Sequence, residues 1–186
     1  MCIKKLSKMQ GVFYSLSPLL PKSTLVTIYY SLVYPIVSQN VVIWGGIAEA
    51  NIRNVKIALN NIMRSILNVK YDENNIPLMS TNYMYKSLNF LKFEDIHKYF
   101  LLTFMQFIIR KNEDLFNNYL GPLIPHHPYG TRGTRINLPD VRLEIERQFA
   151  IFQMCKLFND LPQHIIDSNT RQSLKYRFKN YAISQY

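Results

Sequence analysis

Apolar positions in the first two thirds of the chain recur at intervals of three and four residues. Over residues 48–68 they fall on one face: Ile52, Val55, Leu59, Ile62, Met63, Ile66 and Leu67. This spacing is typical of an amphipathic helix that packs on a core. The same pattern predicts helices over residues 2–15, 24–34, from Pro35 to Gly45-Gly46, and over 80–89, 93–111 and 113–120.

Prolines, glycines and small polar residues separate these segments. Ser17-Pro18 ends the first predicted helix, and Ser23 can cap the second. Pro35 suits the first turn of a third helix, because an N–H would have no partner there. Gly45-Gly46 is expected to stop it, and Asp72–Pro77 reads as a loop.

The last third of the chain has a different pattern. Residues 121–133 are rich in Pro and Gly and predict a linker. Beyond it, apolar and polar residues alternate around Pro139-Asp140, which favours a short β-hairpin. Helices are expected near 148–158 and from Asn169-Thr170 onward. The predicted fold is mainly α: a helical domain over 1–120, the linker, and a small α+β unit over 134–186.

The charge is uneven along the chain. The sequence has 22 Lys and Arg against 12 Asp and Glu, a net charge of +10, and is 48% hydrophobic, which is enough for a core. Residues 1–70 hold eight basic residues and one acid, residues 71–120 are near neutral, and residues 121–186 are basic again. Such a balance attracts polyanions, either nucleic acid or an anionic membrane, although a solvated surface carries the same charge.

Two helices carry basic stripes. The fourth predicted helix has one stripe on the face opposite its apolar face, formed by Arg53, Lys56, Asn60 and Arg64. The last helix has a second stripe with a spacing of four residues, formed by Arg171, Lys175 and Lys179, with Arg177 nearby. Each stripe can follow a phosphate backbone without reading bases, and each can also be an ordinary solvated face. A weaker third cluster is formed by Arg132, Arg135, Arg142 and Arg147.

Motifs for catalysis are missing from the sequence. No adjacent Asp-Asp pair, phosphate-binding glycine loop or nucleophile elbow is present. His126-His127 has no ligand at metal spacing, and Cys2 and Cys155 form no CxxC pair, so we expect no catalytic residue, metal or cofactor. Cys155 is expected to be a buried structural thiol. The cysteine pattern favours a reducing intracellular compartment, cytoplasmic or nuclear.

Residues 23–48 contain no charged residue and are long enough to cross a bilayer. Pro35 and the polar run Ser38-Gln39-Asn40 lie within this stretch, where lipid would satisfy them poorly. Two consecutive buried helices, and no membrane partner, are therefore the preferred interpretation. Membrane association through residues 23–48 remains an alternative.

Several landmarks, taken in order, resemble the region after the palm in reverse transcriptases of non-LTR retrotransposons, jockey-like or related. They are the run from Leu25 to Pro35 leading to Trp44-Gly45, then Met63-Arg64-Ser65-Ile66, Leu88-Asn89-Phe90-Leu91, Asp95-Ile96, Thr131-Arg132, Leu138-Pro139, Phe158-Asn159-Asp160-Leu161-Pro162 and the Ser173–Tyr181 helix. The resemblance covers nearly the whole chain and depends on order and spacing. Phe158 stands where the family usually has Trp.

This resemblance implies the thumb and post-thumb region of an RNA-directed DNA polymerase, without the catalytic palm and fingers. The implied partners are RNA or an RNA–DNA hybrid and the missing palm and fingers of the parent polymerase. Arg53, Lys56 and Arg64 would then face the duplex. The alternative is an inert helical remnant or a protein-interaction module with no nucleic-acid role.

Overall fold

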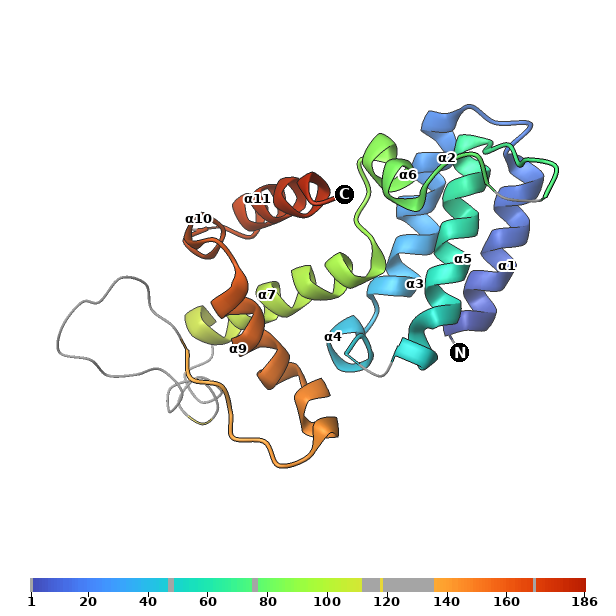
Figure 1. Ribbon diagram of the computed structural model, residues 1–186. Helices are drawn as coiled ribbons and strands as arrows, with labels where there is room; N and C mark the ends of the chain where they lie inside the picture. Colours follow the sequence, from blue (N-terminus) through green and yellow to red (C-terminus); the bar gives the residue numbers. More distant parts are fainter. Residues whose placement is uncertain (1, 47–48, 75–76, 112–117, 119–135, 169) are drawn as a thin grey trace. The chain divides into compact units, whose positions relative to one another are not determined.

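The computed structural model describes residues 2–46, 49–74, 77–111, 118, 136–168 and 170–186, and these are mainly helical (Figure 1). They divide into two compact units, each considered by itself. The first comprises Met1–Gln39, Ala48–Phe93 and Ala182–Tyr186, and the second comprises Asn40–Ile47 and Glu94–Tyr181. The predicted linker at 121–133 lies outside the described residues, as does the helix at 113–120 apart from residue 118, so the division at the linker stays a prediction.

Two long helices, α1 (Cys2–Leu16) and α5 (Glu49–Leu67), run side by side in the first unit (Figure 1). The α2–η1–α3 segment packs against both, and α6 (Thr81–Leu88) packs on α5. Buried residues of α5 include Val55, Leu59, Ile62, Met63 and Ile66. The amphipathic helix predicted over 48–68 is therefore confirmed, with its apolar face in the core.

The stretch around Pro35 stays helical instead of breaking. It consists of α2 (Lys22–Ile28), the π-helical turn η1 (Tyr29–Val33) and α3 (Tyr34–Ser38). Proline has no N–H for the helix ladder, and the widened π turn just before it is a common way to absorb that loss. The predicted Ser23 cap was wrong, because the helix begins at Lys22 and the Ser23 carbonyl accepts the Thr27 hydroxyl at 3.1 Å.

The third predicted helix is also shorter than expected. α3 ends at Ser38, and Asn40 adopts a left-handed conformation at φ 55° before the short α4 (Val41–Trp44). Asparagine tolerates this region better than most residues. None of the described helices combines the length and apolar composition needed to cross a bilayer.

A capped helix and a tight turn attach α6 to the core of the first unit. Ser80 caps α6 by accepting the Tyr83 N–H at 3.3 Å. Asn89 ends the helix in a left-handed conformation, and the Phe90 N–H then donates to the Tyr85 carbonyl at 2.9 Å. Phe90 is buried and stacks on Tyr29, with ring centroids 4.5 Å apart.

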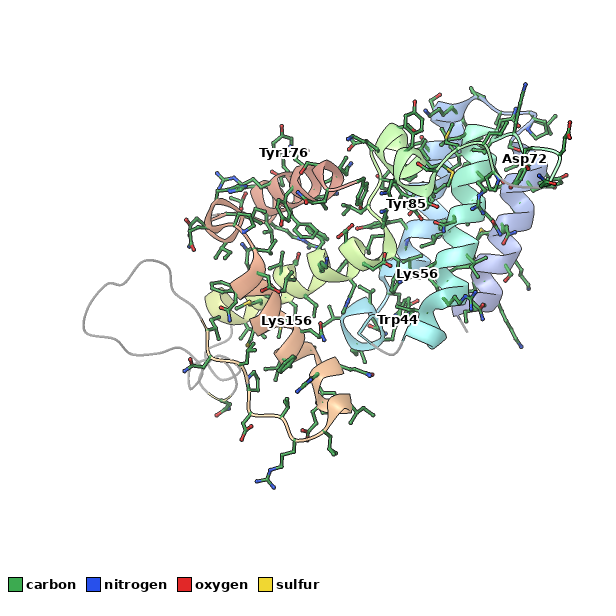
Figure 2. All side chains as sticks on the ribbon, in the orientation of Figure 1. Trp44, Lys56, Asp72, Tyr85, Lys156 and Tyr176 are labelled. Atoms are coloured by element: carbon green, nitrogen blue, oxygen red, sulfur yellow. The ribbon has the colours of Figure 1, made fainter. Side chains whose placement is uncertain are left out.

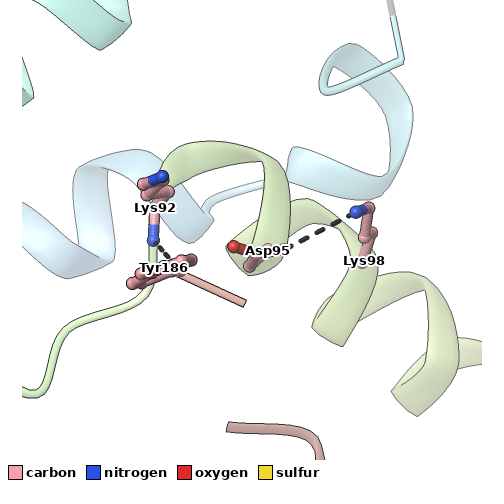
Figure 3. A network of polar contacts seen from close by, with 4 residues as sticks. All are labelled: Lys92, Asp95, Lys98 and Tyr186. Atoms are coloured by element: carbon pink, nitrogen blue, oxygen red, sulfur yellow. Dashed lines mark hydrogen bonds and ion pairs between the residues drawn. The ribbon is translucent and has the colours of Figure 1, made fainter. Parts of the chain in front are cut away.

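Tyr186 is tied back to the first unit at Lys92 (Figure 3). The Lys92 N–H donates to the Tyr186 hydroxyl oxygen at 2.9 Å, and the Lys92 ammonium lies 4.2 Å from the centre of the Tyr186 ring. The Tyr85 ring meets the same tyrosine edge-on. Residues far apart in sequence thus complete this unit.

The second unit contains most of α7 (Phe93–Lys111), with α9 (Ala150–Asp160), α10 (Gln163–Ile166) and most of α11 (Arg171–Ser184). A buried cluster joins α7 to α9: Leu101, Met105, Ile108, Ile136, Met154 and Cys155. Leu174 and Phe178 are buried on α11 as predicted, whereas Tyr181 is half-buried. A second link comes from Gln106, whose amide donates to the Ser168 carbonyl at 3.1 Å.

The β-hairpin predicted around Pro139-Asp140 is absent from the described residues 136–148, which form an extended segment and the 3-10 helix η4 (Glu144–Gln148). The Asn159 side chain accepts the Ile136 N–H at 2.9 Å and donates to its carbonyl at 2.7 Å. The Glu146 carboxylate accepts the N–H groups of Arg142 and Leu143 at 2.7 and 3.0 Å. Side chains therefore occupy the backbone groups that a partner strand would need.

Gly45 is required by packing in the second unit and not only by the end of a helix. A Cβ at this position would lie 2.5 Å from Cδ2 of His97 and 2.5 Å from the Val41 carbonyl oxygen. His97 is 8% exposed, and its Nε2 has no hydrogen-bond partner among the described residues. Burial, helped by the nearby Lys98 charge, lowers the His97 pKa to about 4.

Candidate nucleic-acid interface

Most of the excess positive charge belongs to the first unit. Its three segments hold ten Lys and Arg against three carboxylates, a net charge of +7, whereas the second unit holds twelve against nine. The three acids, Glu49, Asp72 and Glu73, lie just at or beyond the ends of α5. A helical unit with this imbalance attracts a polyanion through its summed field.

The predicted stripe on α5 is only partly available. Arg53 is exposed and has no ion pair within the described part of the chain, whereas Lys56 is half-buried (Figure 2). The Asn60 side-chain oxygen accepts the Tyr85 hydroxyl at 3.1 Å, so this amide partly serves the contact with α6. Arg64 is half-buried, and its Nη1 donates to the Asn61 side-chain oxygen at 2.7 Å.

Arg64 also lines a pocket that the sequence did not indicate. The pocket has a volume of about 630 Å³ and lies in the first unit, between α1 and the last turns of α5. Gly11, Tyr14, Asn61 and Tyr71 are among its lining residues. The Nε atom of Arg64 is buried and has no hydrogen-bond acceptor among the described residues. The stripe therefore ends in a cavity and does not continue as an open surface.

The stripe on α11 is present in the second unit with the expected spacing. Arg171 and Lys175 are exposed, while Lys179 is half-buried. Burial, and then the neighbouring Lys175 charge, lowers the pKa of Lys179. Arg177 donates through Nη1 to the His164 carbonyl. Arg171 and Lys175 are thus the most accessible cations of this stripe.

The third basic cluster is only partly described. Arg132 and Arg135 lie outside the described residues, as does the His126-His127 pair, while Arg142 and Arg147 are exposed. Glu146 binds backbone N–H groups, and these hydrogen bonds lower its pKa. This carboxylate therefore stabilises the turn before η4.

No metal-type cluster is found in the part of the chain that the structure describes: no group of three or more His, Cys, Asp or Glu side chains gathers there. Cys155 is fully buried, and burial raises its pKa to about 11, so it is a structural thiol as predicted. Among the acids, Glu94 and Asp95 lie in the first turn of α7, and Asp95 pairs with Lys98 at 3.6 Å (Figure 3). Negative charges at this position stabilise the N-terminus of a helix through their interaction with the helix dipole.

Three residues with clear structural roles were missed from the sequence. Asn159 binds the backbone of Ile136, His97 packs on Gly45, and Asn61 positions Arg64. The first lies in the Phe158–Pro162 motif quoted for the resemblance, which could have marked it. No local signal marked His97 or Asn61, because their partners are set by packing.

Comparison of the chain with protein-family models, with curated proteins and with solved structures found no match in any of the three. The family resemblance therefore depends on the order of the landmarks in the sequence.

Proposed function

We propose that this chain grips nucleic acid through phosphate contacts, as a fragment of the RNA-directed DNA polymerase of a non-LTR retrotransposon. It would correspond to the thumb and post-thumb region and would bind RNA or an RNA–DNA hybrid. The chemistry of polymerisation would reside in a palm and fingers outside these 186 residues.

One observation carries the proposal: the net charge of +7 in the first unit, with Arg53 exposed and without a carboxylate partner in the described residues. Ion pairs would cancel such a field locally, but Arg53 has none there to do so. The order of the sequence landmarks supports the assignment to a polymerase. They make a template–primer duplex the expected ligand.

Binding should depend on salt. Each phosphate that a cation neutralises releases counterions, so log K falls with log salt by about 0.9 per contact on a duplex. Three contacts would lower the affinity roughly 40-fold between 50 and 200 mM salt. Fluorescence anisotropy with a labelled RNA–DNA hybrid across that range measures the slope. A flat response would exclude the proposal.

Single variants locate the interface. Arg53→Ala should reduce the magnitude of the slope by about one, while Arg53→Lys should keep it, because the charge is retained. Lys22→Ala removes the same charge from the first turn of α2 and serves as the matched control. Equal losses for Arg53→Ala and Lys22→Ala would mean that the general field, and not this face of α5, binds the duplex.

A protein-interaction module is the second candidate, and exposed apolar side chains near η4 favour it. Leu143, Ile145 and Phe149 are 61%, 59% and 61% exposed within seven residues. Exposed apolar groups that gather in this way are common at protein contacts. Absence of affinity for the hybrid at low salt would favour this candidate.

A further inference from the structure

The pocket of the first unit has the size of a small-molecule site. Its volume of about 630 Å³ falls inside the usual range of ~300–1,000 Å³ for ligand pockets. α1 contributes Gln10, Gly11 and Tyr14, α5 contributes Asn61 and Arg64, and Tyr71 follows α5. No carboxylate is among its lining residues.

Gly11 helps to keep the pocket open. It lies in the middle of α1, where glycine weakens a helix relative to alanine. A Cβ added there would meet nothing within 4 Å, so no packing contact of the protein requires the missing side chain. The position borders the cavity, and a larger residue would project toward free space.

Arg64 makes the pocket suited to an anion. Its Nη1 is engaged by Asn61 at 2.7 Å, while its Nε is buried without an acceptor among the described residues. A buried charged donor without a partner is costly, and an anionic oxygen would remove that cost. The planar guanidinium with several donors matches phosphate geometry well. An arginine in the last helical turn also stabilises the helix through its interaction with the helix dipole, but that role does not require a cavity.

Two tyrosines make the pocket suited to a planar ring as well. Tyr14 is 78% exposed and Tyr71 is 50% exposed, although both line the cavity. Exposed aromatic rings beside a cation are the usual platform on which unpaired bases stack. The amide of Gln10 offers both a donor and an acceptor, as a base edge does.

We propose that this pocket binds a single unpaired nucleotide, with its phosphate on Arg64 and its base against a tyrosine ring. The inference rests on the proposed function, since a nucleic-acid strand held by the first unit would supply that nucleotide. It adds to that function a site for unpaired nucleotides. The backbone-gripping face of α5 would not provide such a site.

The test titrates the full chain with nucleoside 5′-monophosphates, with the nucleosides alone and with inorganic phosphate, followed by NMR or calorimetry. The monophosphate should bind more tightly than either part. Gly11→Leu fills the pocket with a good helix former and should weaken monophosphate binding at least about tenfold. Unchanged affinity in Gly11→Leu, or phosphate binding as tightly as nucleotide, would overturn the inference, as would absence of saturable binding.

A second variant guards against loss of folding. Tyr14→Ala changes a mostly exposed residue and should reduce the advantage of nucleotide over phosphate while leaving phosphate affinity unchanged. Equal nucleotide preference in Tyr14→Ala and the wild type would count against a base-stacking role. Circular dichroism, which follows the helices of both units, reports whether each variant is folded.

Hybrid binding by the same proteins separates this inference from the proposed function. Gly11→Leu should keep its salt-dependent affinity for a fully paired hybrid, because Arg53 is untouched. Loss of nucleotide binding in Gly11→Leu, with no hybrid binding by the wild type, would support the pocket and refute the proposed grip. Hybrid binding with unchanged nucleotide affinity in Gly11→Leu would do the reverse.

Discussion

A methyl group added at Gly45 should destabilise the second unit. The new Cβ would lie 2.5 Å from both His97 Cδ2 and the Val41 carbonyl oxygen, well inside van der Waals contact. The φ of Gly45 is −72°, which alanine adopts without strain, so the backbone itself does not oppose the change. Replacing glycine at a compatible position normally adds about 0.4–1 kcal/mol of stability.

Overpacking of a buried site typically costs about 1–3 kcal/mol and here exceeds that gain. One contact is with backbone and the other with a buried ring, so neither can move away cheaply. After the gain is subtracted from the overpacking cost, we expect Gly45→Ala to lower the free energy of unfolding by about 0.5–2 kcal/mol. For a chain of this length, that corresponds to roughly 2–4 °C of melting temperature per kcal/mol.

Urea unfolding followed by Trp44 fluorescence measures this effect locally. Trp44 is the single tryptophan of the chain and precedes Gly45. Gly11→Ala is the matched control, since its Cβ would meet nothing within 4 Å in the middle of α1. It should stabilise the first unit by about 0.5–1 kcal/mol, as measured by urea unfolding followed by circular dichroism. If Gly45→Ala were as stable as the wild type, the close packing of His97 on Gly45 would be refuted.

Three further outcomes are expected. His97 has a pKa of about 4 when folded against about 6.5 when unfolded, so the stability that neutral His97 contributes is fully present above pH 6.5 and falls by about 1–3 kcal/mol toward pH 4. The pH dependence of the urea midpoint across that range should become flatter in His97→Gln. An unchanged pH dependence in this variant would exclude His97 as the cause. Cys155 is fully buried with a raised pKa, so in a Cys2→Ser background a thiol reagent should modify it only as fast as the chain opens, and rapid labelling of the native protein would contradict this burial. Asn159→Leu removes both hydrogen bonds to Ile136 and should cost about 1–3 kcal/mol in urea unfolding; a neutral effect would show that water satisfies the backbone groups equally well.

The helices with a strong apolar period could be predicted from the sequence. α1, α5, α6 and α7 begin and end within about two residues of their predicted limits, since burial of one face determines them. The glycine pair after Trp44 was identified as a stop. Its closer role depends on His97, which lies 52 positions beyond Gly45 and meets it only through folding.

Two of the failures share one physical cause: a side chain distant in sequence binds polar groups that local rules leave without a partner. In place of the predicted hairpin, the backbone N–H of Ile136 donates to the side chain of Asn159, which is 23 residues away in the sequence. In the middle of the α5 stripe, the side-chain oxygen of Asn60 accepts the hydroxyl of Tyr85, which is 25 residues away in the sequence. Local periodicity contains no information about such partners, so it overstated how continuous the cationic face is.

Both compact units are assembled from pieces that flank the stretch 119–135 in the sequence. Ala182–Tyr186 belongs to the first unit, where Tyr186 contacts Lys92, and α9 buries Met154 and Cys155 beside Leu101 of α7. A single cut in that stretch would give two fragments, each carrying part of both cores. Reassociation of the cut halves would then be driven by noncovalent burial, and the nicked protein would be a split complex and not two separated domains.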